Sequence, residues 1–189
     1  MRIVGGRFRG RTLAGPRSDA IRPTSDRLRE TIFNVLTHAY GDPVSGARVL
    51  DLFAGTGAMG LEALSRGAAF ALFVDEGAEA RGIIRANVEA LGVGGETRLF
   101  RRDATRMGRA TPNAAFSLAF CDPPYGKDLA PRALRSCADG GWLAPGALVV
   151  VEEAQGAQVA LPEGFAELER RGYGEMKVVF GRYGARDQD

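Results

Sequence analysis

The 189-residue sequence is poor in the residues that build disulfide frameworks and metal sites, with only two cysteines and one histidine. Cys121 and Cys137 cannot make a disulfide framework and favour a reducing compartment, and His38 with two scattered thiols does not supply a zinc site. No apolar run approaches the roughly 20 residues of a membrane-spanning helix. The N-terminal arginines are not followed by the apolar stretch of a signal peptide. We therefore expect a cytoplasmic protein without a metal or a membrane segment.

The chain also lacks a large net charge, but its charges are unevenly distributed. The formal net charge is +2, with 45% apolar and 25% charged residues, as in ordinary soluble domains. Residues 1–30 contain eight arginines against three acids, a balance of +5, whereas the remaining residues carry 17 basic and 20 acidic groups, a balance of −3. A basic arm on a slightly acidic body is typical of nucleic-acid-binding proteins.

The basic segment contains two short β-prone stretches around Gly5-Gly6, which predict a hairpin with arginines on both sides of Phe8. Proline and glycine residues within 14–23 predict an extended linker. We interpret residues 1–23 as a basic β-hairpin arm with its linker, which would bind RNA. A helix is predicted from Thr24-Ser25-Asp26 onward, because these side chains can cap free N–H groups ahead of an amphipathic stretch.

Beyond this helix, strand and helix patterns alternate. Strands are expected at 48–52, 70–74, 97–100, 116–121 and 147–152. Helices are expected from the glycine-rich turn through about residue 65, at 78–91 and around 129–137. The alternation predicts an α/β fold with an open, mostly parallel sheet and helices on both faces. Residues 165–183 predict two more strands and an antiparallel edge, which makes seven strands. The domain is expected over residues 24–183, and residues 184–189 are expected to be disordered.

A glycine-rich turn, DLFAGTGAMG at 51–60, follows the first strand of this pattern. Its glycines also satisfy G-x-G-x-x-G, and Asp75 follows Gly55 by 20 residues, so a nicotinamide dinucleotide is a legitimate alternative ligand. Asp51 favours a cationic ligand, such as the ammonium of a methionine moiety near a sulfonium, because it would repel a pyrophosphate. Asp75 suits ribose hydroxyls in either case, and Asp103 suits an adenine amino group.

A second motif, Asp122-Pro123-Pro124-Tyr125, follows the fourth strand. The prolines hold the chain extended and present carbonyl oxygens beside the Asp122 carboxylate. Such acceptors suit an exocyclic amino group whose lone pair faces an electrophile. Tyr125 offers a flat face on which a base can stack.

The two motifs together resemble S-adenosylmethionine-dependent amino methyltransferases of the (Asp/Asn)-Pro-Pro-(Tyr/Phe) type. The segments RIVGGRFRGR at 2–11 and RPTSDRLRETIFN at 22–34 are similar to the RsmD family, bacterial methyltransferases that act on a guanine N2 of 16S ribosomal RNA. The resemblance extends from residue 2 to about 183 and implies a Rossmann-like class I methyltransferase fold. The pair Asp75-Glu76 departs from the family, which more often has Glu followed by a later Asp, so the ribose ligand stays open between the two.

The resemblance implies a set of roles. The residues expected to bind S-adenosylmethionine are Asp51, Phe53, Gly55, Thr56, Gly57, Asp75, Glu76, Asp103, Ala104, Arg22 and Thr24. The residues expected to hold and activate the flipped guanine are Asp122, Pro123, Pro124 and Tyr125. The residues expected to bind RNA are Arg2, Arg7, Phe8, Arg9 and Arg11. Arg27 and Glu30 would fix the first helix against the site.

The expected reaction is direct attack of the guanine amino nitrogen on the sulfonium methyl group, without a metal or a covalent enzyme intermediate. The expected partner is 16S ribosomal RNA, in the small subunit or an assembly intermediate, and the expected protein is a monomer. Alternatives are methylation of DNA adenine, of another RNA or of a protein glutamine, a nicotinamide oxidoreductase, and a non-catalytic RNA-binding protein on a methyltransferase scaffold.

Overall fold

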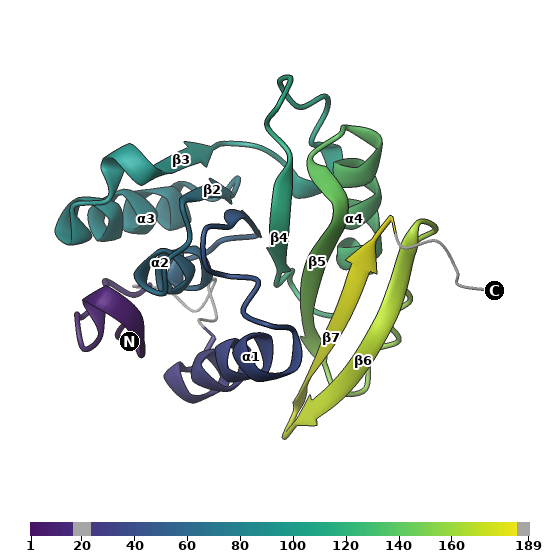
Figure 1. Cartoon of the computed structure of the whole chain (residues 1–189), viewed down its shortest axis with the longest axis horizontal. Coiled ribbons are helices and arrows are strands. Elements are labelled where there is room, and N and C mark those ends of the chain that lie inside the picture. The colour runs from purple at the N-terminus through teal and green to yellow at the C-terminus, as the bar shows by residue number, and fades with distance from the viewer. Residues whose placement is uncertain (17–23, 185–189) are drawn as a thin grey trace.

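The computed structural model describes residues 1–16 and 24–184 of the chain (Figure 1). Its helices are α1 (Asp26–Ala39), α2 (Ala58–Ser65), α3 (Ala78–Leu91) and α4 (Leu129–Asp139). Its strands are β1 (Arg48–Leu52), β2 (Phe70–Val74), β3 (Thr97–Phe100), β4 (Phe116–Cys121), β5 (Leu143–Ala154), β6 (Phe165–Tyr173) and β7 (Met176–Tyr183). Short 3₁₀ turns lie at η1 (Gly6–Phe8), η2 (Gly94–Glu96) and η3 (Ala104–Arg106). No helix of the described ranges is long and apolar enough to cross a membrane.

The seven strands form one sheet in the order β3-β2-β1-β4-β5-β7-β6. Strands β1 to β5 are parallel, and β7 runs antiparallel to both β5 and β6. Val49 of β1 is paired with Ala71 of β2 on one side and Leu118 of β4 on the other. The predicted mostly parallel sheet with an antiparallel edge is therefore confirmed.

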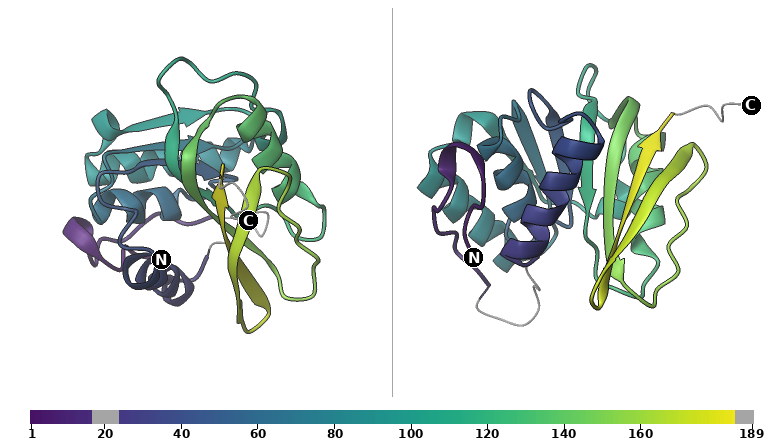
Figure 2. Two further views of the ribbon diagram at one scale, coloured as in Figure 1. Left: turned by 45° about the vertical axis from the view of Figure 1, so that its right-hand side comes forward. Right: turned by 60° about the horizontal axis from the view of Figure 1, so that its bottom comes forward.

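Helices cover both faces of the sheet (Figures 1 and 2). One apolar cluster joins α1, α2 and α3 to the sheet residues Val49, Phe73 and Phe120. The other joins α4 and η3 to the opposite face, where Leu50 and Val149 lie. Because both faces are covered, the central strands are apolar along almost their whole length, which is why they read as continuous hydrophobic runs.

The first helix begins as its sequence predicts, because the Ser25 side chain accepts a hydrogen bond from the Leu28 N–H at 3.1 Å. Its apolar side, including Ile32, Phe33 and Leu36, is fully buried against the sheet. Arg27 and Glu30, expected to fix this helix, are both exposed. Their expected role is not supported, since the buried charged residue of the helix is Arg29.

The predicted N-terminal hairpin is not confirmed. Residues 1–13 instead form a loop around the turn η1, closed by a single antiparallel bridge between Arg2 and Thr12. Backbone hydrogen bonds join the two ends of this loop, from Ile3 N–H to the Arg11 carbonyl at 2.9 Å and from Leu13 N–H to the Met1 carbonyl at 3.1 Å. The pairing does not continue, because the N–H groups of Val4, Gly5 and Phe8 donate to side chains of α2. We call residues 1–13 the N-terminal loop. It lies against α2 (Figure 1). Ile3 and Leu13 of this loop are buried in the core.

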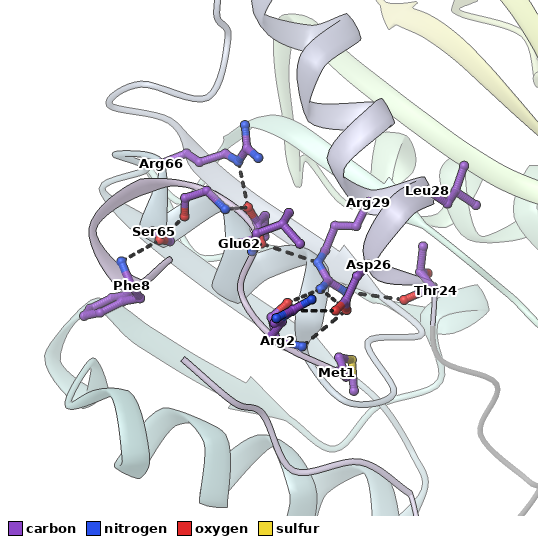
Figure 3. Close-up of polar contacts among 12 residues, drawn as sticks. Met1, Arg2, Phe8, Thr24, Asp26, Leu28, Arg29, Glu62, Ser65 and Arg66 are labelled. Carbon is purple, nitrogen blue, oxygen red and sulfur yellow. Dashed lines mark hydrogen bonds and ion pairs between the residues drawn. The ribbon is translucent and has the colours of Figure 1, made fainter. Parts of the chain in front are cut away.

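A buried carboxylate, that of Glu62 on α2, holds this loop in place (Figure 3). Its oxygens accept hydrogen bonds from the backbone N–H groups of Val4 at 2.9 Å and Gly5 at 2.8 Å. They also pair with Arg66 Nε at 2.7 Å and with the fully buried Arg29 Nε at 3.4 Å. Glu62 thereby connects the N-terminal loop, α1 and α2.

Arg29 extends these contacts toward the start of α1. Its guanidinium pairs with Asp26 at 2.8 Å and donates to the carbonyl oxygens of Arg2 and Thr24. Figure 3 shows the side chain between the N-terminal loop and the backbone of Thr24. Arg29 therefore joins the loop to the residue immediately before the cap of α1.

We predict that Glu62→Ala lowers the free energy of unfolding by about 3–5 kcal/mol, because it removes the buried carboxylate that pairs with the Arg29 guanidinium and leaves two partly buried backbone donors without their acceptor. Urea denaturation followed by circular dichroism measures this change. The matched control is Glu96→Ala, which removes the partner of Arg7 in a half-exposed pair. The control should cost no more than about 1 kcal/mol. Equal costs for the two variants would contradict the role assigned to Glu62.

Candidate active site

Four acidic residues lie along one edge of the sheet, because each lies at or just after the carboxyl end of a parallel strand. In sheet order they are Asp103 after β3, Asp75 after β2, Asp51 within β1 and Asp122 after β4. In open α/β sheets, ligands bind outside this edge, where the strand order reverses. Here the reversal lies between β1 and β4, so Asp51 and Asp122 flank the expected ligand position.

A cleft of about 710 Å³ opens at this edge and brings most of the predicted site together. Its lining includes thirteen predicted residues: Thr24, Asp51, Phe53, Gly55, Thr56, Asp75, Glu76, Asp103, Ala104, Asp122, Pro123, Pro124 and Tyr125. Gly57 is not part of the lining, and Arg22 lies outside the described residues. The cofactor and base residues inferred from separate motifs therefore share one cavity.

The glycine-rich turn directs its backbone donors to the protein's own acceptors. Gly55 N–H donates to Asp75 Oδ2 at 2.9 Å, and Gly60 N–H donates to Asp51 Oδ2 at 2.9 Å. Gly57 N–H donates to the Ala54 carbonyl at 2.7 Å. A dinucleotide pyrophosphate would need such donors for itself. Their use within the chain, beside two carboxylates, disfavours the nicotinamide alternative.

Two positions of the turn have backbone requirements that explain their residues. Gly57 caps α2 with a φ of 77°, in the left-handed region that favours glycine. At Gly60 an added Cβ would lie 2.4 Å from Cε1 of Phe73, so a side chain there would displace the ring. Phe53, which lines the cleft, has a φ of 56°. A non-glycine residue pays roughly 1–3 kcal/mol for such a conformation, which is characteristic of functional sites.

The floor of the cleft is an acidic environment with little solvent. Burial raises the pKa of Asp51 to about 8, and the negative charges of Asp122 and Asp75 add to the increase. Burial and the charge of Asp122 likewise raise the pKa of Glu152, on β5, well above its usual value. A cation bound between these carboxyl groups would relieve both effects, since an opposite charge favours the ionised form.

Glu152, which the motif analysis missed, is not part of the cleft lining but contacts it through Thr24. The Thr24 hydroxyl lies 3.3 Å from Asp122 Oδ2 and 3.4 Å from Glu152 Oε2, so it bridges the two acids. Thr24 was expected to contact the cofactor, and its observed hydrogen bonds are to these two acids. The sequence could have indicated Glu152, because Glu152 and Glu153 are two acids at the end of an otherwise apolar stretch. In the structure both acids are buried.

The far end of the cleft is fixed by η3. Asp103 caps this turn, with its Oδ1 accepting from the Thr105 backbone N–H at 2.8 Å and the Thr105 hydroxyl at 2.7 Å. The hydrogen bond from the Thr105 side chain, supported by the charges of Arg106 and Arg132, holds the pKa of Asp103 below its usual range. Asp103 is therefore ionised at neutral pH and can accept a hydrogen bond from an amino group.

The Asp122–Tyr125 segment is anchored on the neighbouring strands. The Tyr125 hydroxyl donates to Met176 Sδ on β7 at 2.9 Å, and Gly126 N–H donates to Glu153 Oε1 on β5 at 3.3 Å. Pro123 is buried, Pro124 is exposed and Tyr125 is half-buried. The strand order, not the local sequence, provides these anchors, because β5 lies next to β4 in the sheet and β7 lies next to β5.

The predicted RNA-binding residues lie outside the cleft lining, on the N-terminal loop. Arg2 lies 3.6 Å from Asp26, Arg7 pairs with Glu96 and lies over the Phe8 ring, and Arg11 donates to the Ala90 carbonyl at 2.8 Å. All four arginines, including Arg9, are exposed, and Phe8 is half-buried. The loop thus presents guanidinium groups to solvent from a docked position rather than from a free tail.

The strand order, the glycine turn and the acids at the switch point define a class I methyltransferase fold. Residues 1–182 match the model of the family described as Conserved hypothetical protein 95, and the chain belongs to this family. It is 41% identical over 155 residues to ribosomal RNA small subunit methyltransferase D of Escherichia coli, covering 80% of this chain and 74% of that protein. It is 31% identical to the protein of the same name from Haemophilus influenzae, covering 90% and 88%.

The fold agrees with a solved structure of this group. The Escherichia coli protein yhhF superposes with a TM-score of 0.81 at 32% identity, covering 98% of this chain and 99% of that chain. The predicted RsmD-family resemblance and the class I methyltransferase fold are therefore confirmed. Because the family match begins at residue 1, it includes the N-terminal loop.

We predict that stability decreases as the pH rises from about 5 to 8, in part because of Asp51. The folded state retains a proton on this carboxyl up to about pH 8, whereas the unfolded chain releases it near pH 4. Asp51→Asn should flatten this dependence and be more stable than the parent at pH 8.5, by about 1 kcal/mol or more. Urea unfolding across the pH range measures both effects. The control Glu89→Gln, at an exposed position of α3, should leave the change of unfolding free energy with pH as it is in the parent. If Asp51→Asn also leaves that pH dependence unaltered, the raised pKa of Asp51 is refuted.

Proposed function

We propose that this protein transfers a methyl group from S-adenosylmethionine to the exocyclic N2 amino group of a guanine in 16S ribosomal RNA. The observation that carries the proposal is the single cleft in which Asp51, Asp75 and Asp103 meet Asp122 and Tyr125. One end offers acceptors for a cationic, adenosine-containing molecule, and the other offers acceptors and an aromatic face for a base. The named relatives support ribosomal RNA as the substrate.

The residues of the cleft fit S-adenosylmethionine by their chemistry. Asp51 is a fully buried carboxyl near two other acids, and such a group is stabilised by a neighbouring cation. Asp51 would hold the methionine ammonium, Asp75 or Glu76 the ribose hydroxyls, and Asp103 with Ala104 the adenine. When bound, the cofactor supplies an electrophilic methyl group on a positively charged sulfur. Thr24 would act by positioning Asp122 and Glu152, with which it hydrogen-bonds.

The protein's own contribution at the other end is to orient a poor nucleophile. The lone pair of a guanine amino group is conjugated into the ring, and accepting its hydrogens at Asp122 and the Pro123 carbonyl favours the pyramidal geometry needed for attack. Tyr125 would stack on the base, a contact worth about 1–3 kcal/mol. The Tyr125–Met176 and Gly126–Glu153 contacts hold this segment in place before the base arrives.

The target guanine has to leave its stack to reach the cleft, at a cost of a few kcal/mol that is smallest for loop nucleotides. The exposed arginines of the N-terminal loop would contribute by contacting phosphates. We further propose that the protein acts in the cytoplasm as a monomer on the small subunit or an assembly intermediate. Mapping the methylated base by mass spectrometry tests this specificity, and methylation of DNA or protein instead would contradict it.

We predict that Asp122→Ala lowers kcat for methyl transfer by at least about 100-fold, since it removes an acceptor that acts on the reacting amino group. The measurement is radiolabelled methyl transfer to small ribosomal subunits from cells that lack the enzyme. The dissociation constant for 16S ribosomal RNA should change less than about threefold. Glu163→Ala, an exposed acid in the turn before β6, should retain full activity. Full activity of the Asp122 variant would refute its catalytic role.

We predict that S-adenosylhomocysteine raises the Tm of the protein and that NAD does not. Ligand binding stabilises the folded state by RT ln(1 + L/Kd), where L is the free ligand concentration, so a concentration of about 100 times the Kd adds about 2.7 kcal/mol. The shift with S-adenosylhomocysteine should decrease in Asp51→Asn. Stabilisation by NAD alone would replace the proposal with a nicotinamide-dependent reaction.

A further inference from the structure

A second hollow adjoins the cleft on the side of η3 and α4. It has a volume of about 440 Å³ and shares two lining residues with the cleft, Thr105 and Arg132. The hollow also brings together Arg109, from the loop after η3, and Arg135 of α4. All three guanidinium-bearing residues are exposed, so the hollow is open to a large ligand.

The three arginines of the hollow lack the ion pairs that many other arginines of this protein form. Six other arginines form ion pairs with carboxylates, but within residues 1–16 and 24–184 Arg109, Arg132 and Arg135 form no ion pair. Asp139 borders the same hollow without reaching ion-pair distance. The charge of Arg132 also acts on Asp103 in the cleft, but three guanidinium groups against the one carboxylate of Asp139 leave the lining of the hollow with an excess of positive charge. The arrangement therefore favours an anionic ligand.

The hollow is held in shape by hydrogen bonds between its two sides. Met107 N–H donates to Ser136 Oγ at 2.7 Å, Ala110 N–H donates to the Gly140 carbonyl at 2.9 Å, and Trp142 Nε1 donates to the Gly108 carbonyl at 2.8 Å. Arg132 and Arg135 are three residues apart on α4, a spacing that places them on one face. These contacts fix Arg109 opposite α4 without a ligand, as a preorganised binding surface requires.

We infer that Arg109, Arg132 and Arg135 form a phosphate-binding surface that holds the RNA backbone beside the target guanine. The inference rests on the proposed function and adds a second point of contact to it. The N-terminal loop packs with the α1–α3 face of the sheet, whereas this surface lies with α4 on the other face. Because the hollow shares Thr105 and Arg132 with the cleft, RNA held in the hollow lies beside the cleft that contains Asp122.

The test compares two double variants that remove the same charge. Arg109→Gln with Arg135→Gln removes two guanidinium groups that line the hollow but not the cleft. Arg170→Gln with Arg171→Gln removes two from β6, at the far edge of the sheet. The affinity for 16S ribosomal RNA is measured between about 50 and 200 mM salt, with the affinity for S-adenosylhomocysteine measured in parallel.

We expect the first variant to bind RNA on the order of tenfold more weakly, with a salt slope reduced by about 1 to 2, because it loses two phosphate contacts. Its affinity for S-adenosylhomocysteine should stay within about twofold of the parent, since neither residue lines the cofactor cleft. The β6 variant should match the parent in both measurements. Arg135→Lys, which keeps the charge, should retain most of the affinity, and this separates loss of charge from loss of structure.

The outcomes distinguish the two proposals. If the parent protein methylates ribosomal RNA and the two double variants bind RNA equally well, the phosphate surface is refuted and the proposed function stands. Weakened S-adenosylhomocysteine binding in the Arg109/Arg135 variant would also overturn the inference, because the surface would then belong to the cofactor site. If the parent neither binds nor methylates ribosomal RNA, the proposed function fails, and the inference fails with it.

Discussion

The arrangement of the N-terminal third of the molecule depends on one buried carboxylate. Glu62 accepts from the N-terminal loop, from α1 through Arg29 and from α2 through Arg66. A buried charge of this kind is tolerated only when its lone pairs are satisfied, so the three segments have to assemble together. Arg29 carries the constraint on to Thr24, whose hydroxyl lies against Asp122 and Glu152. The basic loop and the acidic cleft are thus two ends of one connected set of contacts.

The charges of the molecule are separated according to burial. The acids at the carboxyl edge line a cleft in which burial raises the pKa of Asp51, and a cationic ligand suits them. The arginines of the N-terminal loop and of the hollow by α4 lie on exposed surfaces, where a polyanion can reach them. The net charge of +2 hides this separation. The basic hollow by α4 is not evident from the charge balance either, because residues 31–189, which contain it, carry more acidic than basic groups.

The fold was predictable from local patterns. Apolar runs of five or six residues between helical stretches specified β1, β2 and β4, because strands covered on both faces are continuously apolar. Ser25 specified the start of α1, and the acids after the strands could be placed on one edge once the sheet was taken as parallel. Asp51, Asp75, Asp103 and Asp122 line one cleft for that reason. The roles assigned to them stay proposals that ligand binding and mutagenesis can test.

The sequence by itself therefore determined the type and order of the elements and the acids that follow the strands, since these depend on short-range periodicity. Only the tertiary structure decided that Arg29 is the buried charged residue of α1. It also decided that three backbone N–H groups of the N-terminal loop donate to Glu62 and Ser65 of α2, which limits the pairing of the loop's two ends. It further decided that Thr24 joins Asp122 to Glu152, although Asp122 lies 98 residues and Glu152 lies 128 residues beyond Thr24 in the chain. Such contacts depend on which distant donors and acceptors burial brings together, and no local pattern encodes that pairing.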